Sequence, residues 1–241
     1  MSHHAQLHGT AQRYWAYGLA AAREASEFGR GTGIISRMTH QMIYLGHPDH
    51  AVALIEVAHR AAARDDVPRL QAKLSAQHGR ILAALGHPHG ALEHLDRAHT
   101  QLDAASTAPT PPWIAYFTPA KLGGATAVSH RDLRELHHRR GIPPASTHFA
   151  AAIRQREPSY DRSTAMDLVG LAAAQFAEGD LDAGCATARQ SIDLAAQMDS
   201  ALITARINTL ISAAAQHAHN PQLTDLYERV RAMSNGNPVA G

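Results

Sequence analysis

A repeat with a period of 40 residues constrains the fold of this chain more than any other feature of its sequence. Residues 44–51 (YLGHPDHA) match residues 84–91 (ALGHPHGA) when one copy is shifted by 40 positions. Weaker copies of the same pattern occupy residues 140–145 and 177–183. Periods of roughly 30 to 50 residues are typical of helical solenoids, whose hairpins cannot bury their apolar faces alone and therefore stack on one another. The repeat predicts such a stack.

The residues of each copy are those of a turn between two helices. Gly46 and Gly86 tolerate the left-handed backbone conformation that commonly follows the last turn of a helix. Pro48 and Pro88 come two residues later, where the first turn of the next helix needs no backbone N–H group. In the copy at 177–183, Asp180 offers a side chain that accepts hydrogen bonds from the free N–H groups of a helix start.

Apolar residues at helical spacing extend this pattern along the chain. Ala51, Leu54, Ile55 and Ala58 form one stripe, as expected for a helix with one buried face. Alanine, the strongest helix former, makes up about a fifth of the chain, and aromatic residues only 5%. We therefore expect no sheet. We expect helices at residues 10–27, 31–45, 49–63, 68–85, 89–104, 114–138, 145–156, 161–177, 181–197, 199–217 and 221–233.

The predicted fold class is all-α, a right-handed solenoid over residues 1–233. Within it we expect a partial first repeat at 1–27, a linker loop at 105–112 (ASTAPTPP) and an irregular repeat at 118–160. The last residues, 234–241, show no apolar period and predict a flexible tail.

Composition and charge exclude several classes of protein. The 22 Lys and Arg residues nearly balance the 21 Asp and Glu residues, which argues against a general polyanion binder. The single cysteine, Cys185, excludes an intramolecular disulfide and a cysteine-based zinc cage, and we expect it to be a small buried residue. No apolar run approaches the roughly 18 residues of a membrane span, and the first residues lack a secretory signal pattern. We expect a cytoplasmic protein.

The spacing of small residues in the repeat resembles that of the tetratricopeptide repeat (TPR). In that repeat a Gly closes the first helix and an Ala follows five residues later, as in Gly46/Ala51 and Gly86/Ala91. Gly79, seven residues before Gly86, stands where the TPR consensus has a further Gly. The resemblance implies a TPR-like solenoid in which the first helix of each hairpin lines a concave binding face.

Four stretches carry a closer likeness: AQRYW at 11–15, HQMIYLG at 40–46, PPWIAYF at 111–117 and DRSTAMDL at 161–168. In them the chain is similar to the C-terminal sensor domains of actinobacterial helix-turn-helix transcriptional regulators associated with sporulation and differentiation. The resemblance implies a part in transcriptional regulation. Such regulators usually begin with a DNA-binding domain, whereas this sequence begins with what resembles the second helix of a repeat. We therefore expect no direct binding of nucleic acid by this chain.

Counting back from the turn glycines places polar residues on the first helices of two successive hairpins. Three cations, an amide, a phenol and an imidazole gather there, a set that can bind a peptide carboxylate or acidic side chains by charge-assisted hydrogen bonds. The alternative is that some of them are solvated helix positions. The candidate groove consists of Arg37, His40, Tyr44, Lys73, Gln77 and Arg80.

The 18 histidines are the obvious candidates for metal binding. His47 and His50 flank one turn, and His87 and His89 flank another. Each turn supplies only two imidazoles and no carboxylate to complete a site, so we expect no bound metal and no other cofactor.

Two further segments have a simpler interpretation than the one their motifs suggest. The GRGTG sequence at 29–33 follows a helix and lacks the rest of a phosphate-binding motif, so it predicts a turn between repeats. Residues 131–140 are the most charged segment. They are expected to form a solvated helix face with an Arg131–Glu135 ion pair, in preference to a basic binding patch.

These observations favour a non-enzymatic domain that binds a peptide, a partner protein or a small signal molecule. Two alternatives stay open. One is a stand-alone scaffold that self-associates as a homodimer through Tyr14, Trp15 and Tyr17 of the first hairpin remnant. The other is an enzyme built on a helical solenoid, either cofactor-free or with a histidine-bound metal.

Overall fold

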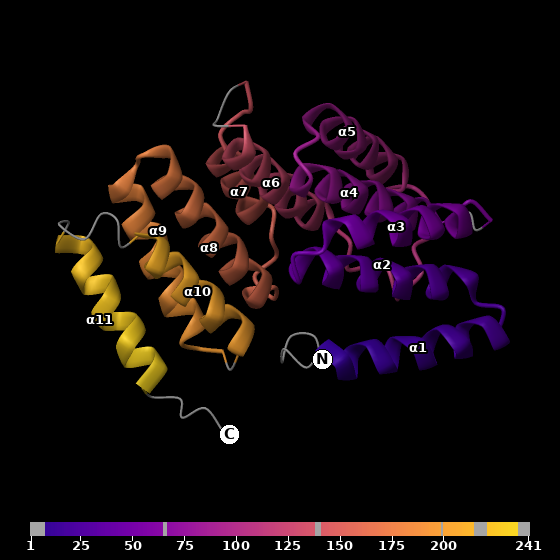
Figure 1. Ribbon diagram of the computed structural model, residues 1–241, viewed down its shortest axis with the longest axis horizontal. Helices are drawn as coiled ribbons and strands as arrows, with labels where there is room; N and C mark the ends of the chain where they lie inside the picture. Colours follow the sequence, from indigo (N-terminus) through magenta and orange to yellow (C-terminus); the bar gives the residue numbers. More distant parts are fainter. Residues whose placement is uncertain (1–7, 65–66, 138–140, 199, 215–220, 236–241) are drawn as a thin grey trace. The chain divides into compact units, whose positions relative to one another are not determined.

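The structure is a computed structural model that describes residues 8–64, 67–137, 141–198, 200–214 and 221–235 (Figure 1). Within these ranges the regular structure is entirely α-helical, as predicted. None of the described helices combines the length and the apolar character that a membrane crossing requires. The helices are α1 (His8–Glu24), α2 (Phe28–Tyr44), α3 (Pro48–Ala62), α4 (Pro68–Ala84), α5 (Pro88–Ala104), α6 (Pro119–Leu136), α7 (Ala145–Arg154), α8 (Asp161–Glu178), α9 (Leu181–Ala195), α10 (Ala201–Ala214) and α11 (Pro221–Asn235).

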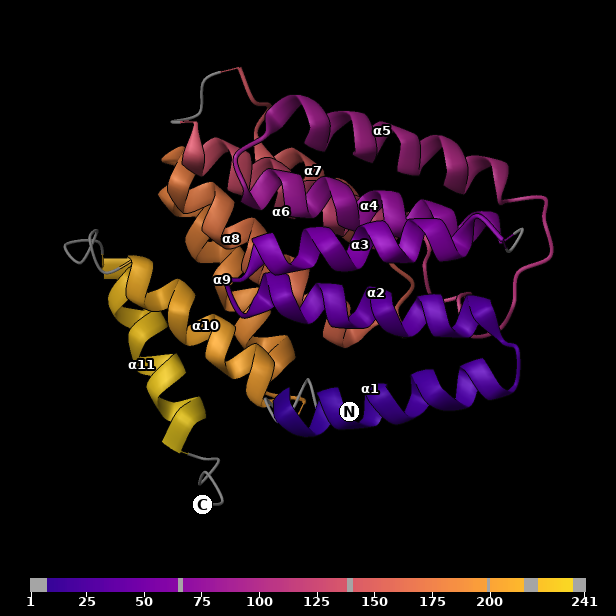
Figure 2. The ribbon, with the colours of Figure 1, turned by 45° about the vertical axis from the view of Figure 1, so that its right-hand side comes forward.

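The chain folds into two compact units, and the sequence passes from the first to the second between Pro143 and Pro144. In the first unit, α2 and α3 form one hairpin and α4 and α5 form the next, and α4 also packs against α2 and α6. Figure 2 shows α2, α3, α4 and α5 lying side by side. In the second unit, α8 pairs with α9 and α10 with α11, and α8 also packs against α7 and α10. Each unit therefore stacks helical hairpins as an α-solenoid does.

The turns confirm the predicted local chemistry. Gly46, Gly86 and Gly179 have φ angles of +79°, +75° and +92°, so each adopts the left-handed conformation. After the first two, the backbone N–H of the next residue donates to a carbonyl five residues back, at 2.9 Å in both turns. The N–H of the glycine itself donates to the carbonyl three residues back, at 3.1 Å in both turns, and the two bonds satisfy carbonyl groups at the helix end. Pro48 and Pro88 each begin the following helix.

Small residues lie where helices approach most closely. Ala51 and Ala91 are fully buried, as the repeat predicted. A Cβ atom on Gly79 would lie 2.9 Å from the Ala91 carbonyl oxygen and 2.9 Å from Leu95 Cγ, so α4 and α5 pack at a distance that only glycine allows. Separate apolar cores fill the two units, built around Ile55, Leu70, Leu74 and Leu122 in the first and Ile203, Ile207, Leu223 and Leu226 in the second.

The predicted turn at 29–33 is wrong. These residues lie within α2, which begins at Phe28. A Cβ atom on Gly33 would lie 3.4 Å from the Trp113 ring, and one on Gly31 would lie 3.7 Å from the Ala22 methyl group. The glycines therefore let other segments pack closely against a helix, and this packing outweighs their low helix propensity.

Several element boundaries and one ion pair also differ from the sequence-based expectation. Helix α6 begins at Pro119 and not at 114, because the Thr118 side chain accepts a hydrogen bond from the Lys121 N–H and caps it there. The loop predicted at 105–112 consequently extends to residue 118. Helix α11 reaches Asn235, so the flexible tail predicted for 234–241 is wrong at residues 234 and 235, and residues 236–241 lie outside the described residues. Arg131 pairs with its neighbour Asp132, at 2.6 Å, and not with Glu135.

Candidate functional site

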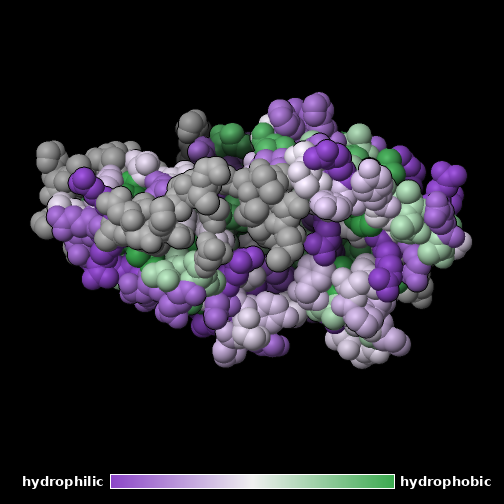
Figure 3. Space-filling model, turned by 90° about the horizontal axis from the view of Figure 1, so that it is seen from below, coloured by the Kyte–Doolittle hydropathy of each residue, from purple (hydrophilic) through white to green (hydrophobic). Residues whose placement is uncertain are grey.

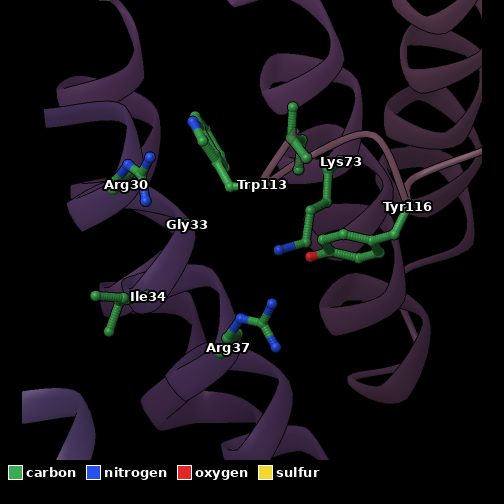
Figure 4. Close-up of a pocket in the computed structure, with 8 residues that line it drawn as sticks. Arg30, Gly33, Ile34, Arg37, Lys73, Trp113 and Tyr116 are labelled. Atoms are coloured by element: carbon green, nitrogen blue, oxygen red, sulfur yellow. The ribbon is translucent and has the colours of Figure 1, made fainter. Parts of the chain in front are cut away.

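A pocket of about 220 Å³ opens in the first unit between α2, α4 and the loop at 105–118. Helix α2 contributes four residues at helical spacing, so all four lie on one face of that helix. The loop supplies two aromatic walls, and α4 supplies one lysine (Figure 4). The lining residues are Arg30, Gly33, Ile34, Arg37, Lys73, Trp113, Ile114 and Tyr116.

The loop that carries Trp113 and Tyr116 is fixed by the core on both sides of these residues. Ile114 and Phe117 are almost fully buried, at 1% and 6% exposure. The Arg69 guanidinium, at the start of α4, donates a 2.9 Å hydrogen bond to the Phe117 carbonyl oxygen. The two aromatic side chains are therefore held in place before any ligand arrives, which reduces the entropy lost on binding.

Two basic side chains lie over the ring of one tyrosine in this pocket. The Lys73 Nζ and the Arg37 Cζ each lie 5.6 Å from the centroid of the Tyr116 ring, within the range of a cation–π interaction. Lys73 is only 7% exposed, whereas Arg37 is exposed at the pocket's edge. Among the described residues neither has a carboxylate partner, and no acidic residue lines the pocket. Arg30 differs, because it pairs with Glu27 at 3.2 Å.

Burial perturbs the pKa of this lysine strongly. Burial, and secondarily the positive charge of Arg37, lowers the pKa of Lys73 from its ordinary value of 10.5 to about 7. Burial also raises the pKa of the Tyr116 hydroxyl, so this phenol stays neutral at neutral pH, although Arg37 acts in the opposite direction. The pocket therefore contains an unbalanced positive charge beside apolar and aromatic walls. This combination can bind an anionic group attached to an apolar or planar one.

The structure brings together two of the six predicted groove residues, Arg37 and Lys73. Gln77 is buried and joins α4 to α2, because its Nε2 donates to the Ser36 carbonyl oxygen at 2.8 Å and its Oε1 accepts from the Ser36 hydroxyl. The Tyr44 ring lies 5.6 Å from the His8 ring. His40, which is exposed, and Arg80, which is half-buried, are not among the pocket's lining residues.

Six of the eight lining residues escaped the sequence-based prediction, and those with charged or aromatic side chains are Arg30, Trp113 and Tyr116. The spacing of Arg30 and Arg37, seven residues apart, could have indicated that they share a helix face once α2 was extended to Phe28. Trp113 and Tyr116 carried no such signal, because a loop returns them to α2 and α4.

A second polar cluster lies where α3, α4 and α5 meet. The ring centroids of His78 and His94 are 4.0 Å apart, and that of His59 lies 5.5 Å from His78 and 6.3 Å from His94. One buried nitrogen of each ring, Nε2 of His59 and Nδ1 of the other two, has no hydrogen-bond partner. Burial lowers the pKa of all three imidazoles, to about 4 for His59 and His94. The cluster is therefore uncharged at neutral pH.

Neither this cluster nor the turn histidines form a metal centre. The described residues contain no group of three or more His, Cys, Asp or Glu side chains that could hold a metal ion. The His47 and His50 rings stack at 5.5 Å at the start of α3. Cys185 is fully buried, as predicted, and burial raises the pKa of its thiol.

The fold defines this chain as an all-α protein of the helical-solenoid class. Its pocket is a cationic site with aromatic walls. No protein-family model and no curated protein matches the sequence.

Proposed function

We propose that this chain is a non-enzymatic recognition domain whose pocket binds the anionic group of a peptide, a partner protein or a small signal molecule. The observation that carries the proposal is the juxtaposition of Lys73 and Arg37 without an acidic neighbour among the described residues. A buried ammonium group is costly unless a negative charge accompanies it. A bound carboxylate would offset that cost and accept charge-assisted hydrogen bonds from both side chains.

The size of the pocket favours one chemical group over a whole peptide. Its volume of about 220 Å³ is below the roughly 300 Å³ at which drug-sized pockets begin. An acidic side chain or a chain terminus would enter the pocket, and the rest of a peptide or partner would lie outside it. The pocket lies on α2 and α4, the first helices of successive hairpins, where the TPR resemblance places a binding face.

The wider role follows from resemblance. We propose that the chain is the signal-sensing part of a cytoplasmic transcriptional regulator of the actinobacterial type described above. The near balance of 22 basic and 21 acidic residues supports binding of a signal or a protein over direct binding of DNA. The reading frame upstream of Met1 tests this role, because an in-frame helix-turn-helix coding region there would connect the pocket to a DNA-binding domain.

Calorimetric titration with benzoate, which joins a carboxylate to an aromatic ring, tests the proposed site. Benzamide, its uncharged analogue, is the matched ligand control. Charge-assisted hydrogen bonds contribute about 1.5–3 kcal/mol each, so Lys73→Met and Arg37→Gln should each weaken benzoate binding by roughly tenfold to a hundredfold. The control variant Arg60→Gln, at a 70%-exposed side chain of α3, should leave binding unchanged. Equal binding of benzoate and benzamide would overturn the proposal.

A second candidate function is self-association through α1. Tyr14 and Tyr17 are 67% and 73% exposed, and Phe28, at the start of α2, is 50% exposed. Figure 3 views the chain from below Figure 1, the side on which α1 lies there, and among the residues drawn in colour hydrophilic ones predominate and hydrophobic ones form small separate patches. Sedimentation of the wild type and of a Tyr14→Ser/Tyr17→Ser variant tests this candidate. A concentration-dependent dimer that the double substitution dissociates would support it, and a monomer in both would exclude it.

A further inference from the structure

Lysine is rare in this protein, and one of its lysines is in the pocket. The sequence contains 22 lysines and arginines, but lysine occurs only at positions 73 and 121. All the other residues of that set are arginines, including Arg30 and Arg37 of the same pocket. Arginine cannot lose its proton in a protein, whereas a buried lysine can become a neutral amine. The pocket therefore contains one group with a chemistry that its arginines lack.

We propose that the Lys73 amine is a covalent binding site, which forms an imine with a small carbonyl compound that also carries a carboxylate. The inference rests on the proposed function in one respect, because Arg37 would hold the carboxylate of this compound. Figure 4 shows the Lys73 nitrogen and the Tyr116 hydroxyl directed toward the same part of the pocket, with Arg37 facing them from α2. The Trp113 ring forms a further wall of this space.

The step requires no reagent beyond the amine and the carbonyl compound. The lone pair of the neutral Nζ attacks the carbonyl carbon, and the C=O π electrons move to the oxygen, which takes up a proton. The nitrogen loses a proton to give a neutral carbinolamine, whose hydroxyl takes up a second proton and leaves as water while the nitrogen lone pair forms the C=N bond. The nitrogen then loses its remaining proton, which returns to the group that supplied the second one. The net reaction converts one amine and one aldehyde into one imine and one water. Tyr116, whose hydroxyl stays protonated, can supply the proton that the departing oxygen needs.

The pocket keeps Lys73 in the reactive form. With a pKa of about 7, half of the Lys73 side chains are neutral at pH 7, compared with roughly one in three thousand for an ordinary lysine with a pKa of 10.5. A weaker base is also a weaker nucleophile, which cancels part of this gain. Desolvation and a neighbouring cation are the established means by which proteins activate an amine for imine formation. Both are present here, as burial and as Arg37.

Reductive trapping with glyoxylate tests the proposal on the full-length chain. Glyoxylate combines an aldehyde with a carboxylate, and cyanoborohydride reduces its imine to a stable carboxymethyl-lysine. The protein is treated at neutral pH, digested, and the modified peptides are quantified by mass spectrometry. Lys121, a half-buried residue of α6, is the internal control. We expect Lys73 to be modified at least about tenfold faster than Lys121, and we expect this lead to disappear when the chain is unfolded in urea.

Three controls separate covalent binding from anion binding. Acetaldehyde, which lacks the carboxylate, should show a smaller preference for Lys73 than glyoxylate does. The rate of Lys73 modification should rise through about pH 7 and level off one to two pH units higher, where almost all of the Lys73 amine is neutral. The variant Lys73→Arg keeps the charge without the nucleophile, so it should still bind benzoate and gain no carboxymethyl group at residue 73.

The outcomes distinguish this inference from the proposed function. Modification of Lys73 no faster than that of Lys121 in the folded protein would overturn the covalent site. If benzoate still binds and its binding still depends on Arg37, the anion pocket stands without the imine. If benzoate does not bind and Lys73 shows no preference, both proposals fail.

Discussion

Replacement of Lys73 by methionine should stabilise the ligand-free protein at neutral pH. Methionine keeps the long apolar stem that packs in the pocket and removes the buried charge. The pKa of Lys73 is about 7 in the folded state and 10.5 without the fold, a difference of about 3.5 units. At about 1.36 kcal/mol per unit, the cost of keeping the protonated lysine in the folded state reaches at most about 5 kcal/mol. Local relaxation reduces such costs, so we expect a gain of about 2–4 kcal/mol in the free energy of unfolding.

The pH dependence of this gain identifies its cause. The pKa of Lys73 is lower in the folded state, so the unfolded state binds more protons between about pH 7 and pH 10.5. The contribution of Lys73 to wild-type stability is therefore fully present above pH 10.5 and is lost as the pH falls toward 7. The advantage of Lys73→Met should accordingly be largest near pH 7 and shrink as the pH rises toward 10.5.

Urea unfolding of the wild type and of Lys73→Met, measured at several pH values, provides the test. Lys121→Met is the matched control, because it replaces the other lysine of the chain. A constant difference between wild type and Lys73→Met across this pH range would refute the reasoning, and so would a destabilised Lys73→Met variant at pH 7.

Three further predictions concern the helix stack itself. The pKa of His94 is lowered from 6.5 to about 4, so its contribution to stability is fully present above pH 6.5 and is lost as the pH falls toward 4. His94→Leu should reduce this acid-induced loss of stability by about 1 kcal/mol, a value discounted for the partial exposure of the ring, when urea unfolding is compared at pH 6.5 and pH 4. Gly79→Ala should destabilise the protein by about 1–3 kcal/mol in the same assay, because the added methyl group would lie 2.9 Å from the α5 backbone. Gly9→Ala is the control: its methyl group would have no neighbouring atom within 4 Å, so this variant should be neutral or slightly stabilising. Gly46→Ala should lower the stability by about 1–2 kcal/mol, because its φ of +79° strains any residue with a Cβ atom, and an unchanged thermal midpoint would contradict that assignment.

The helices could be predicted from the sequence because their ends are set by local chemistry. A left-handed glycine, a proline at a first helical position and an apolar stripe each act within a few residues of chain. Gly46 and Gly86 therefore placed two hairpin turns correctly from the sequence alone. The segment at 29–33 failed for the opposite reason. Its glycines suggest a turn, and only the packing of Trp113 against Gly33, from a loop about 80 residues further along the chain, explains why they are helical.

The candidate site could be predicted only in part, because local patterns place residues on helices but do not show which distant segments pack against them. Arg37 and Lys73 were found because their positions follow from counting along two predicted helices. Tyr116 and Trp113 were missed because the path of a loop across α2 and α4 leaves no periodic signal in the sequence. The His59, His78 and His94 cluster was missed because its members come from three helices. Gln77 was placed on the expected helix, but it serves to join α4 to α2 through Ser36.

The ionisation of Lys73, with and without an anion in the pocket, tests the central claim most directly. With only two lysines in the chain, ¹³C labelling of lysine gives two side-chain signals, and the Lys73→Met variant assigns them. We predict that the Lys73 signal titrates with a pKa near 7 in the free protein and that saturating benzoate raises this pKa toward 10.5, because a bound carboxylate favours the ammonium form. A Lys73 pKa near 10.5 in the free protein, or one that benzoate leaves unchanged, would contradict the account of this pocket as an anion-recognition site.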